Sequence, residues 1–184
     1  PVYPEDRIHY LIRLFLSSDG YLKADDIADR MFISRSTLSN DLKEVKERLK
    51  YFQLEIESIP NYGMRLKGSE FHKRSAISQY FFHTDNIDEK AVMDTAKTKE
   101  QSEIASILYR VIEKERFYLT DAGFEGLVIH IMIALMRLKK GKINRTFESD
   151  KSLINSREYQ IAEEICAQLD ETFHCNMPQS ERCF

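Results

Sequence analysis

The chain has 184 residues, of which 42% are hydrophobic and 31% charged, as in one large or two small globular domains. No apolar run approaches the roughly 18 residues that cross a bilayer, so we expect no membrane partner. The net charge of −3 gives no overall attraction to nucleic acid. The charge is uneven, however: residues 1–29 carry three basic and six acidic side chains, whereas residues 30–67 carry eight basic and five acidic ones.

The three cysteines, Cys166, Cys175 and Cys183, form no CxxC pair. This spacing argues against a disulfide framework and against a metal site on Cys175 and His174. We therefore expect reduced thiols in a cytoplasmic protein without metal or cofactor. The chain begins with Pro1 and no signal-peptide pattern, so we expect a fragment of a longer protein.

Apolar residues recur at helical spacing over the first fifty residues. A helix is predicted after Pro4, a short second helix at residues 24–30, and a third that Ser34 caps. The third helix carries an apolar stripe: Leu38, Leu42, Val45 and Leu49. After Tyr51 the period becomes alternating, and turn residues 60–63 separate two predicted strands. Three helices followed by a hairpin is the order of a winged helix-turn-helix.

The second half is predicted to be an all-α helical bundle. Residues 71–82 are expected to form a helix that links two domains, and the polar segment from Thr84 to Thr98 is expected to begin as a loop. Further helices are predicted around residues 104–112, from Thr120 or Asp121 to Lys140, around residues 159–169, and after Pro178. We place domain boundaries at 1–69 for the winged helix, 70–98 for the linker and 99–184 for a C-terminally truncated bundle.

The third helix has the side chains of a DNA-reading element. In a helix-turn-helix the N-terminal residues of the second helix of the pair meet base edges in the major groove. The polar residues there are Arg35, Ser36, Thr37, Ser39, Asn40 and Lys43. We expect Arg35 to suit guanine, Asn40 adenine, and Ser36, Thr37 and Lys43 phosphates. In the wing, the corresponding residues are Asn61, Tyr62, Arg65 and Lys67. The alternative is a small helical domain with a solvated polar face.

Two runs resemble a known winged helix: ISRSTLSNDLKEV from Ile33 and NYGMRLKG from Asn61. They are similar to the Mga-like domain of bacterial sugar-operon activators, which carry phosphotransferase-system regulation domains (PRDs). The run LVIHIMIALMR from Leu127 resembles a PRD helix, and EYQIAEEI from Glu158 and PQSE from Pro178 resemble later PRD helices. The resemblance implies a mainly α protein that binds double-stranded DNA and regulates carbohydrate genes.

The resemblance also implies that His130 accepts a phosphoryl group from a phosphotransferase-system protein, either HPr or an Enzyme IIB. Arg137, seven residues further, shares its helix face and is a possible phosphate partner. From the residues alone, a single histidine in an apolar helix is more often a packed core residue. Such a domain normally carries a second histidine after the Pro-x-x-Glu turn, and the chain ends at Phe184 before reaching one. We expect a homodimer, because one winged helix makes limited contact with DNA.

Three alternatives remain open at this point. An RNA-binding antiterminator of the same family is disfavoured, because its RNA-binding module is β-rich and residues 4–51 are predicted to be helical. An enzyme is disfavoured by the lack of a phosphate-binding glycine loop, an HExxH pattern or a nucleophile–base set. A protein-interaction module that does not read DNA is compatible with the sequence.

Overall fold

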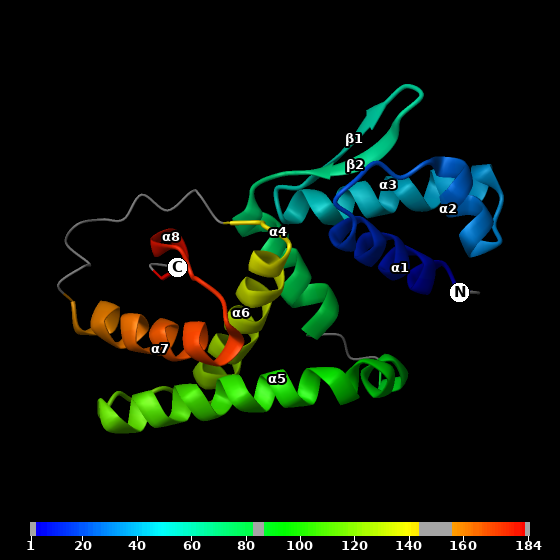
Figure 1. The fold of residues 1–184 in the computed structure, drawn as a ribbon. Helices are drawn as coiled ribbons and strands as arrows, with labels where there is room; N and C mark the ends of the chain where they lie inside the picture. Colours follow the sequence, from blue (N-terminus) through cyan, green and yellow to red (C-terminus); the bar gives the residue numbers. More distant parts are fainter. Residues whose placement is uncertain (1–2, 83–86, 144–155, 183–184) are drawn as a thin grey trace. The chain divides into compact units, whose positions relative to one another are not determined.

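The computed structural model describes residues 3–82, 87–143 and 156–182, and for residues 87–98 the backbone alone. The chain divides into two compact units, unit 1 (Pro1–Thr84) and unit 2 (Asp85–Phe184). Figure 1 labels the helices and strands of both units. Among the helices of the described ranges, none is long and apolar enough to cross a membrane.

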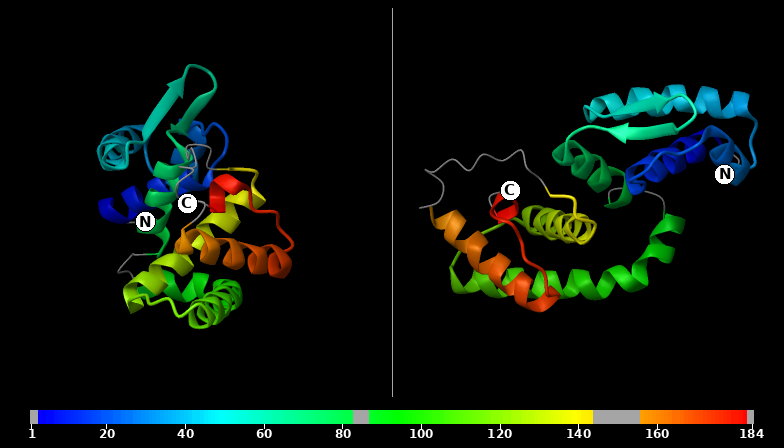
Figure 2. Two further views of the ribbon diagram at one scale, coloured as in Figure 1. Left: turned by 90° about the vertical axis from the view of Figure 1, so that its left-hand side faces the viewer. Right: turned by 45° about the horizontal axis from the view of Figure 1, so that its top comes forward.

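Unit 1 contains the expected three helices and wing. Its elements are α1 (Pro4–Ser17), α2 (Ala24–Met31), α3 (Arg35–Tyr51), β1 (Glu55–Ile59), β2 (Gly63–Lys67), α4 (Glu70–Ile77) and the π-helical turn η1 (Ser78–Phe82). Helix α3 contacts α1, α2 and β1, and the loop of the hairpin stands clear of the helices (Figures 1 and 2). The fold is therefore mainly helical, with a helix-turn-helix followed by a wing.

The core of unit 1 forms where the apolar faces of α1, α2 and α3 meet. Phe15 is 1% exposed and is the largest of its fully buried side chains. Ser34 caps α3, since its hydroxyl accepts a hydrogen bond from the Thr37 amide at 3.1 Å. The turn before it places Phe32 in the left-handed region at φ 54°, with its ring 95% exposed. Both observations fix where α3 begins.

One charged residue interrupts the apolar face of α3. Leu42 is only half-buried, whereas its neighbour Asp41 is buried. The Asp41 carboxylate accepts two hydrogen bonds from Arg7 on α1, at 2.7 Å from Nε and 3.0 Å from Nη2. This bidentate contact raises the pKa of Arg7. It fixes how α1 crosses α3, because a buried carboxylate must keep its partner.

The wing is an antiparallel pair in which Ile56 faces Leu66 and Ser58 faces Met64. Leu22, between α1 and α2, extends this pair by one bridge. Its amide donates to the Met64 carbonyl at 2.7 Å, and its carbonyl accepts from the Met64 amide at 2.8 Å. The close approach depends on Gly63, whose φ is +117° and where a Cβ would lie 2.5 Å from the Leu22 oxygen.

Replacing Gly63 with alanine is therefore expected to destabilise unit 1 by roughly 1–3 kcal/mol, because both the backbone conformation and the contact with Leu22 are lost. Urea unfolding followed by circular dichroism measures the change. The control is Gly20→Ala, since a Cβ at Gly20 would meet nothing within 4 Å. Equal stability of the two variants would contradict the role given to Gly63.

Helix α4 and η1 belong to unit 1. Both contact α1, and Arg13 of α1 donates a hydrogen bond from Nε to the Tyr80 carbonyl at 2.8 Å. The Arg13 guanidinium also lies 5.4 Å from the centre of the Phe81 ring. We expected residues 70–98 to act as a linker helix followed by a loop. In the structure α4 and η1 pack against α1, and the next helix begins earlier than expected, at Ile87.

Unit 2 consists of α5 (Ile87–Lys114), α6 (Asp121–Lys139), α7 (Arg157–Phe173) and the short α8 (Gln179–Arg182). Thr120 caps α6 by accepting from the Gly123 amide at 3.1 Å, as expected. Helix α5 contacts both α6 and α7 around one apolar core, whose buried members are Ile104, Ile107, Leu108, Val111, Val128, Leu135, Ile161, Ile165, Cys166, Leu169 and Met177. The polar loop expected from Lys142 to Lys151 falls mainly outside the described residues.

Candidate nucleic-acid interface and regulatory histidine

The first two turns of α3 present the polar side chains that the sequence singled out. Five of the six are exposed: Arg35, Ser36, Ser39, Asn40 and Lys43. Thr37 is half-buried, and its hydroxyl lies 2.9 Å from that of Ser34. The Asn40 side-chain oxygen accepts a hydrogen bond from Lys43 at 3.3 Å. Thr37 is thus partly engaged in the cap, while the others face solvent on one stretch of helix.

A groove of about 350 Å³ runs along this stretch of α3, beside the start of α2. It is lined by Ala24, Arg35, Leu38, Ser39, Leu42, Lys43 and Lys46. Lys46 was missed in the sequence analysis, although its position eleven residues after Arg35, about three helical turns, placed it on the same side. Arg35 also forms an ion pair with Asp25, in the first turn of α2.

The wing gathers its polar residues around an acid. The Glu57 carboxylate accepts a hydrogen bond from Arg65 Nε at 2.7 Å and lies 3.7 Å from Lys67 Nζ. Its hydrogen bond with Arg65 lowers the pKa of Glu57 and raises that of Arg65. The Arg65 guanidinium stacks 5.0 Å from the centre of the Tyr21 ring. The four residues form one cluster on the hairpin and the segment before α2.

The tip of the wing holds the remaining two predicted residues. Asn61 adopts the left-handed region at φ 67°, and Tyr62 is exposed with its ring 6.0 Å from that of Tyr21. Asparagine tolerates this conformation better than most residues, which suits a tight hairpin. Tyr62 therefore presents an exposed aromatic ring next to the cations of the wing.

In unit 2, His130 lies on α6 with an exposed side chain. It lines a cavity of about 520 Å³ with residues of α5, α6, α7 and α8. The charged residues around the same cavity are Glu158, Glu181 and Arg182. A histidine in an apolar helix is more often packed in the core, but His130 is not.

Arg137, seven residues along α6, is only 3% exposed. Seven residues correspond to about 10 Å along a helix axis, so the two side chains share a face but differ in their surroundings. A contact between Arg137 and a phosphate on His130 stays a prediction. The exposure of His130 is the property that a phosphoryl donor requires.

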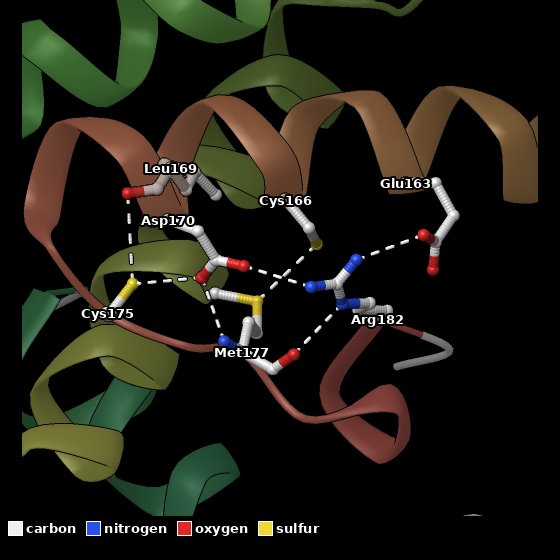
Figure 3. Close-up of polar contacts among 7 residues, drawn as sticks. All are labelled: Glu163, Cys166, Leu169, Asp170, Cys175, Met177 and Arg182. Atoms are coloured by element: carbon white, nitrogen blue, oxygen red, sulfur yellow. Dashed lines mark hydrogen bonds and ion pairs between the residues drawn. The ribbon is translucent and has the colours of Figure 1, made fainter.

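The sulfur-containing residues near α8 form a structural cluster (Figure 3). Cys166 Sγ lies 3.4 Å from Met177 Sδ, and the Cys175 thiol donates to Asp170 Oδ1 at 3.3 Å. Burial raises the pKa of Cys166 to about 12, and burial together with the hydrogen bond to Asp170 raises that of Cys175 to about 11. Both thiols are protonated near neutral pH and are poor nucleophiles.

Asp170 holds the end of the described chain in place. Its Oδ1 accepts from the Met177 amide at 2.8 Å, and its Oδ2 accepts from Arg182 at 2.9 Å. Arg182 also donates to Glu163 at 3.0 Å. In the part of the chain that the structure describes, no group of three His, Cys, Asp or Glu side chains is placed to hold a metal ion. Cys183 lies outside the described residues.

Comparison with known families agrees with this division of the chain. Residues 2–81 match the Mga helix-turn-helix domain, and residues 105–184 match the PRD domain. The chain therefore consists of an Mga helix-turn-helix domain followed by a PRD domain. The RNA-binding antiterminator alternative lacks support, because the N-terminal domain is a helix-turn-helix.

Two relatives from Bacillus subtilis (strain 168) are similar over almost the whole chain. The probable licABCH operon regulator is 35% identical over 190 residues, which cover 100% of this chain and 29% of that protein. The transcriptional regulator ManR is 25% identical over 183 residues, which cover 98% of this chain and 28% of that protein. Both are named as regulators. The chain spans less than a third of the length of either relative.

Proposed function

We propose that the chain reads double-stranded DNA with α3 and the wing, and regulates carbohydrate uptake or utilisation genes in the cytoplasm. The observation that carries this proposal is the exposed run of Arg35, Ser36, Ser39 and Asn40 on the first turns of α3. These residues are at the end of the helix that enters the major groove in helix-turn-helix proteins. One relative is named as a probable operon regulator and the other as a transcriptional regulator, and both names support the same reading.

Each proposed contact follows from side-chain chemistry. Arg35 carries a planar fork of donors that matches the O6 and N7 acceptors of guanine, and Asn40 can pair with adenine. Ser36, Thr37, Ser39 and Lys43 suit phosphates, as do Arg65 and Lys67 in the wing. Asn61 and Tyr62 at the wing tip are proposed to reach the minor groove or the backbone.

The proposed control of DNA binding acts through His130. An imidazole nitrogen of His130 attacks the phosphorus of a phosphorylated donor, either HPr or an Enzyme IIB. The donor's bond to phosphorus breaks and its electron pair returns to the donor, while a new N–P bond forms. The added group brings about −1.5 to −2 charges by analogy with phosphoserine, and Arg137 is the proposed partner. We propose that this charge changes the association of a homodimer.

Replacing Arg35 with alanine tests the DNA-reading part. A duplex is first selected from a randomised pool by the wild-type chain, and binding is then measured against salt concentration for that duplex and a scrambled one. Arg35→Ala is expected to lose discrimination by about 5- to 150-fold, the range of a bidentate arginine–guanine contact. Affinity of the wild type should fall steeply with added salt.

Lys50→Ala serves as the matched control, because Lys50 is an exposed cation at the opposite end of α3. This variant should discriminate between the selected and the scrambled duplex as well as the wild type does. If the wild-type chain enriches no sequence from the pool, unit 1 does not read DNA. That result would favour the alternative of a protein-interaction module. Light scattering at tens of micromolar tests the dimer, and a purely monomeric chain would refute it.

A further inference from the structure

We infer that Asp25 is a specificity-determining residue with two effects on Arg35. It positions Arg35 for reading a base, and it weakens the binding of Arg35 to phosphate groups in DNA of unrelated sequence. The inference rests on the proposed function, since it concerns how the same face of α3 selects its DNA. The observation behind it is the ion pair that joins Asp25 Oδ1 to Arg35 Nη2. Asp25 was assigned no role from the sequence.

The ion pair spans the helix-turn-helix itself. Asp25 lies in the first turn of α2, and Arg35 is the first residue of α3. Both side chains remain open to solvent, at 56% and 74% exposure. An exposed ion pair contributes little to stability, so holding the fold together does not account for it. Its position on the DNA-facing end of α3 indicates an effect on binding.

The geometry leaves Arg35 able to bind a base while it is held. A guanidinium has five N–H donors, and a contact to Asp25 through Nη2 leaves donors available for the two acceptors of guanine. Without the acid, the long arginine side chain would sample many rotamers. Part of the ordering that base reading requires is therefore present before DNA arrives.

The charge of Asp25 acts against non-specific contacts. A carboxylate beside the helix proposed to read DNA repels phosphate groups, so a phosphate binds Arg35 against the charge of Asp25. A guanine edge carries no formal charge and is not repelled in this way. Asp25 therefore lowers affinity for arbitrary DNA more than for the correct site, which is how a repulsive element creates specificity.

Asp25→Asn tests this inference, with Asp26→Asn as its matched control. Asp26 is also an exposed acid in the first turn of α2, so its replacement changes the net charge and the helix terminus equally. The full chain is titrated with the duplex selected by the wild type, with that duplex carrying A·T in place of each G·C pair, and with a scrambled duplex. Asp25→Asn is expected to lose guanine discrimination by at least about five-fold while its affinity for scrambled DNA stays equal or rises.

Two further variants separate positioning from a structural effect. Asp25→Glu should recover part of the discrimination, and Asp25→Asn should have no added effect on discrimination in an Arg35→Ala background. Retained discrimination in Asp25→Asn, or a parallel loss of specific and scrambled binding, would overturn the inference. If the wild type selects no duplex at all, the proposed function itself fails and the inference with it. That result is distinct, because it appears before any variant is compared.

Discussion

Replacing His130 with alanine is expected to abolish phosphoryl transfer to the chain. The histidine is exposed on α6, so the substitution removes the proposed acceptor without opening a cavity in the core. Alanine also favours a helix more than histidine does, which keeps α6 intact. The chain is incubated with phosphorylated HPr or Enzyme IIB, and acid-labile phosphate is measured by intact mass. The wild type should gain one phosphoryl group and His130→Ala none.

The control for this experiment is His174→Asn. His174 is exposed in the same unit but adopts the left-handed region at φ 50°, which asparagine also tolerates. This variant should be phosphorylated like the wild type. Phosphate on the His130→Ala chain would show that another residue is the acceptor. An unphosphorylated wild type would remove the proposed regulation while leaving the DNA-reading proposal intact.

Replacing Phe15 with alanine is expected to destabilise unit 1 by about 3–5 kcal/mol, because the ring is fully buried and its loss leaves a cavity. This is a large share of the 5–15 kcal/mol that typically holds a domain folded. Urea unfolding measures the loss. Since each unit is compact by itself, amide exchange should accelerate in α1–α3 and not in α5–α7.

Phe32→Ala is the matched control, since it removes the same atoms from a ring that is 95% exposed. Phe32→Ala should change the free energy of unfolding by no more than about 0.5 kcal/mol, as other surface substitutions do. If the two variants cost the same, the burial of Phe15 does not determine its contribution. Faster exchange throughout both units would instead show that they unfold together.

Local patterns were sufficient to predict most of the helices and the wing. Helical spacing of apolar residues marked α1, α3, α6 and α7, and the alternating pattern marked β1 and β2. Ser34 was predicted as an N-cap, and Thr120 or Asp121 as another. The structure confirms Ser34 and selects Thr120, since each hydroxyl accepts a hydrogen bond from the amide three residues later. Each of these signals lies within a few residues of the element it specifies.

Features that depend on distant partners could not be predicted. The burial of Asp41 requires Arg7, 34 residues earlier, and periodicity placed the apolar contact on Leu42 instead. The pairing of Arg35 with Asp25 and of Arg65 with Glu57 depends on how α2 and the wing are folded. In α6 the apolar neighbours of His130 suggested burial, but its side chain is exposed beside a cavity that residues distant in the sequence also line.

The hydrogen bond from Arg13 to the Tyr80 carbonyl has a mechanical consequence. The π-turn η1 is the last described element of unit 1, and four residues (83–86) separate it from the start of α5. Because Arg13 holds the Tyr80 carbonyl, η1 is tied to α1, and α1 is tied in turn to α3 through the Arg7–Asp41 contact. Two arginine contacts from one helix thus join the last described turn of unit 1 to the helix that we propose reads DNA.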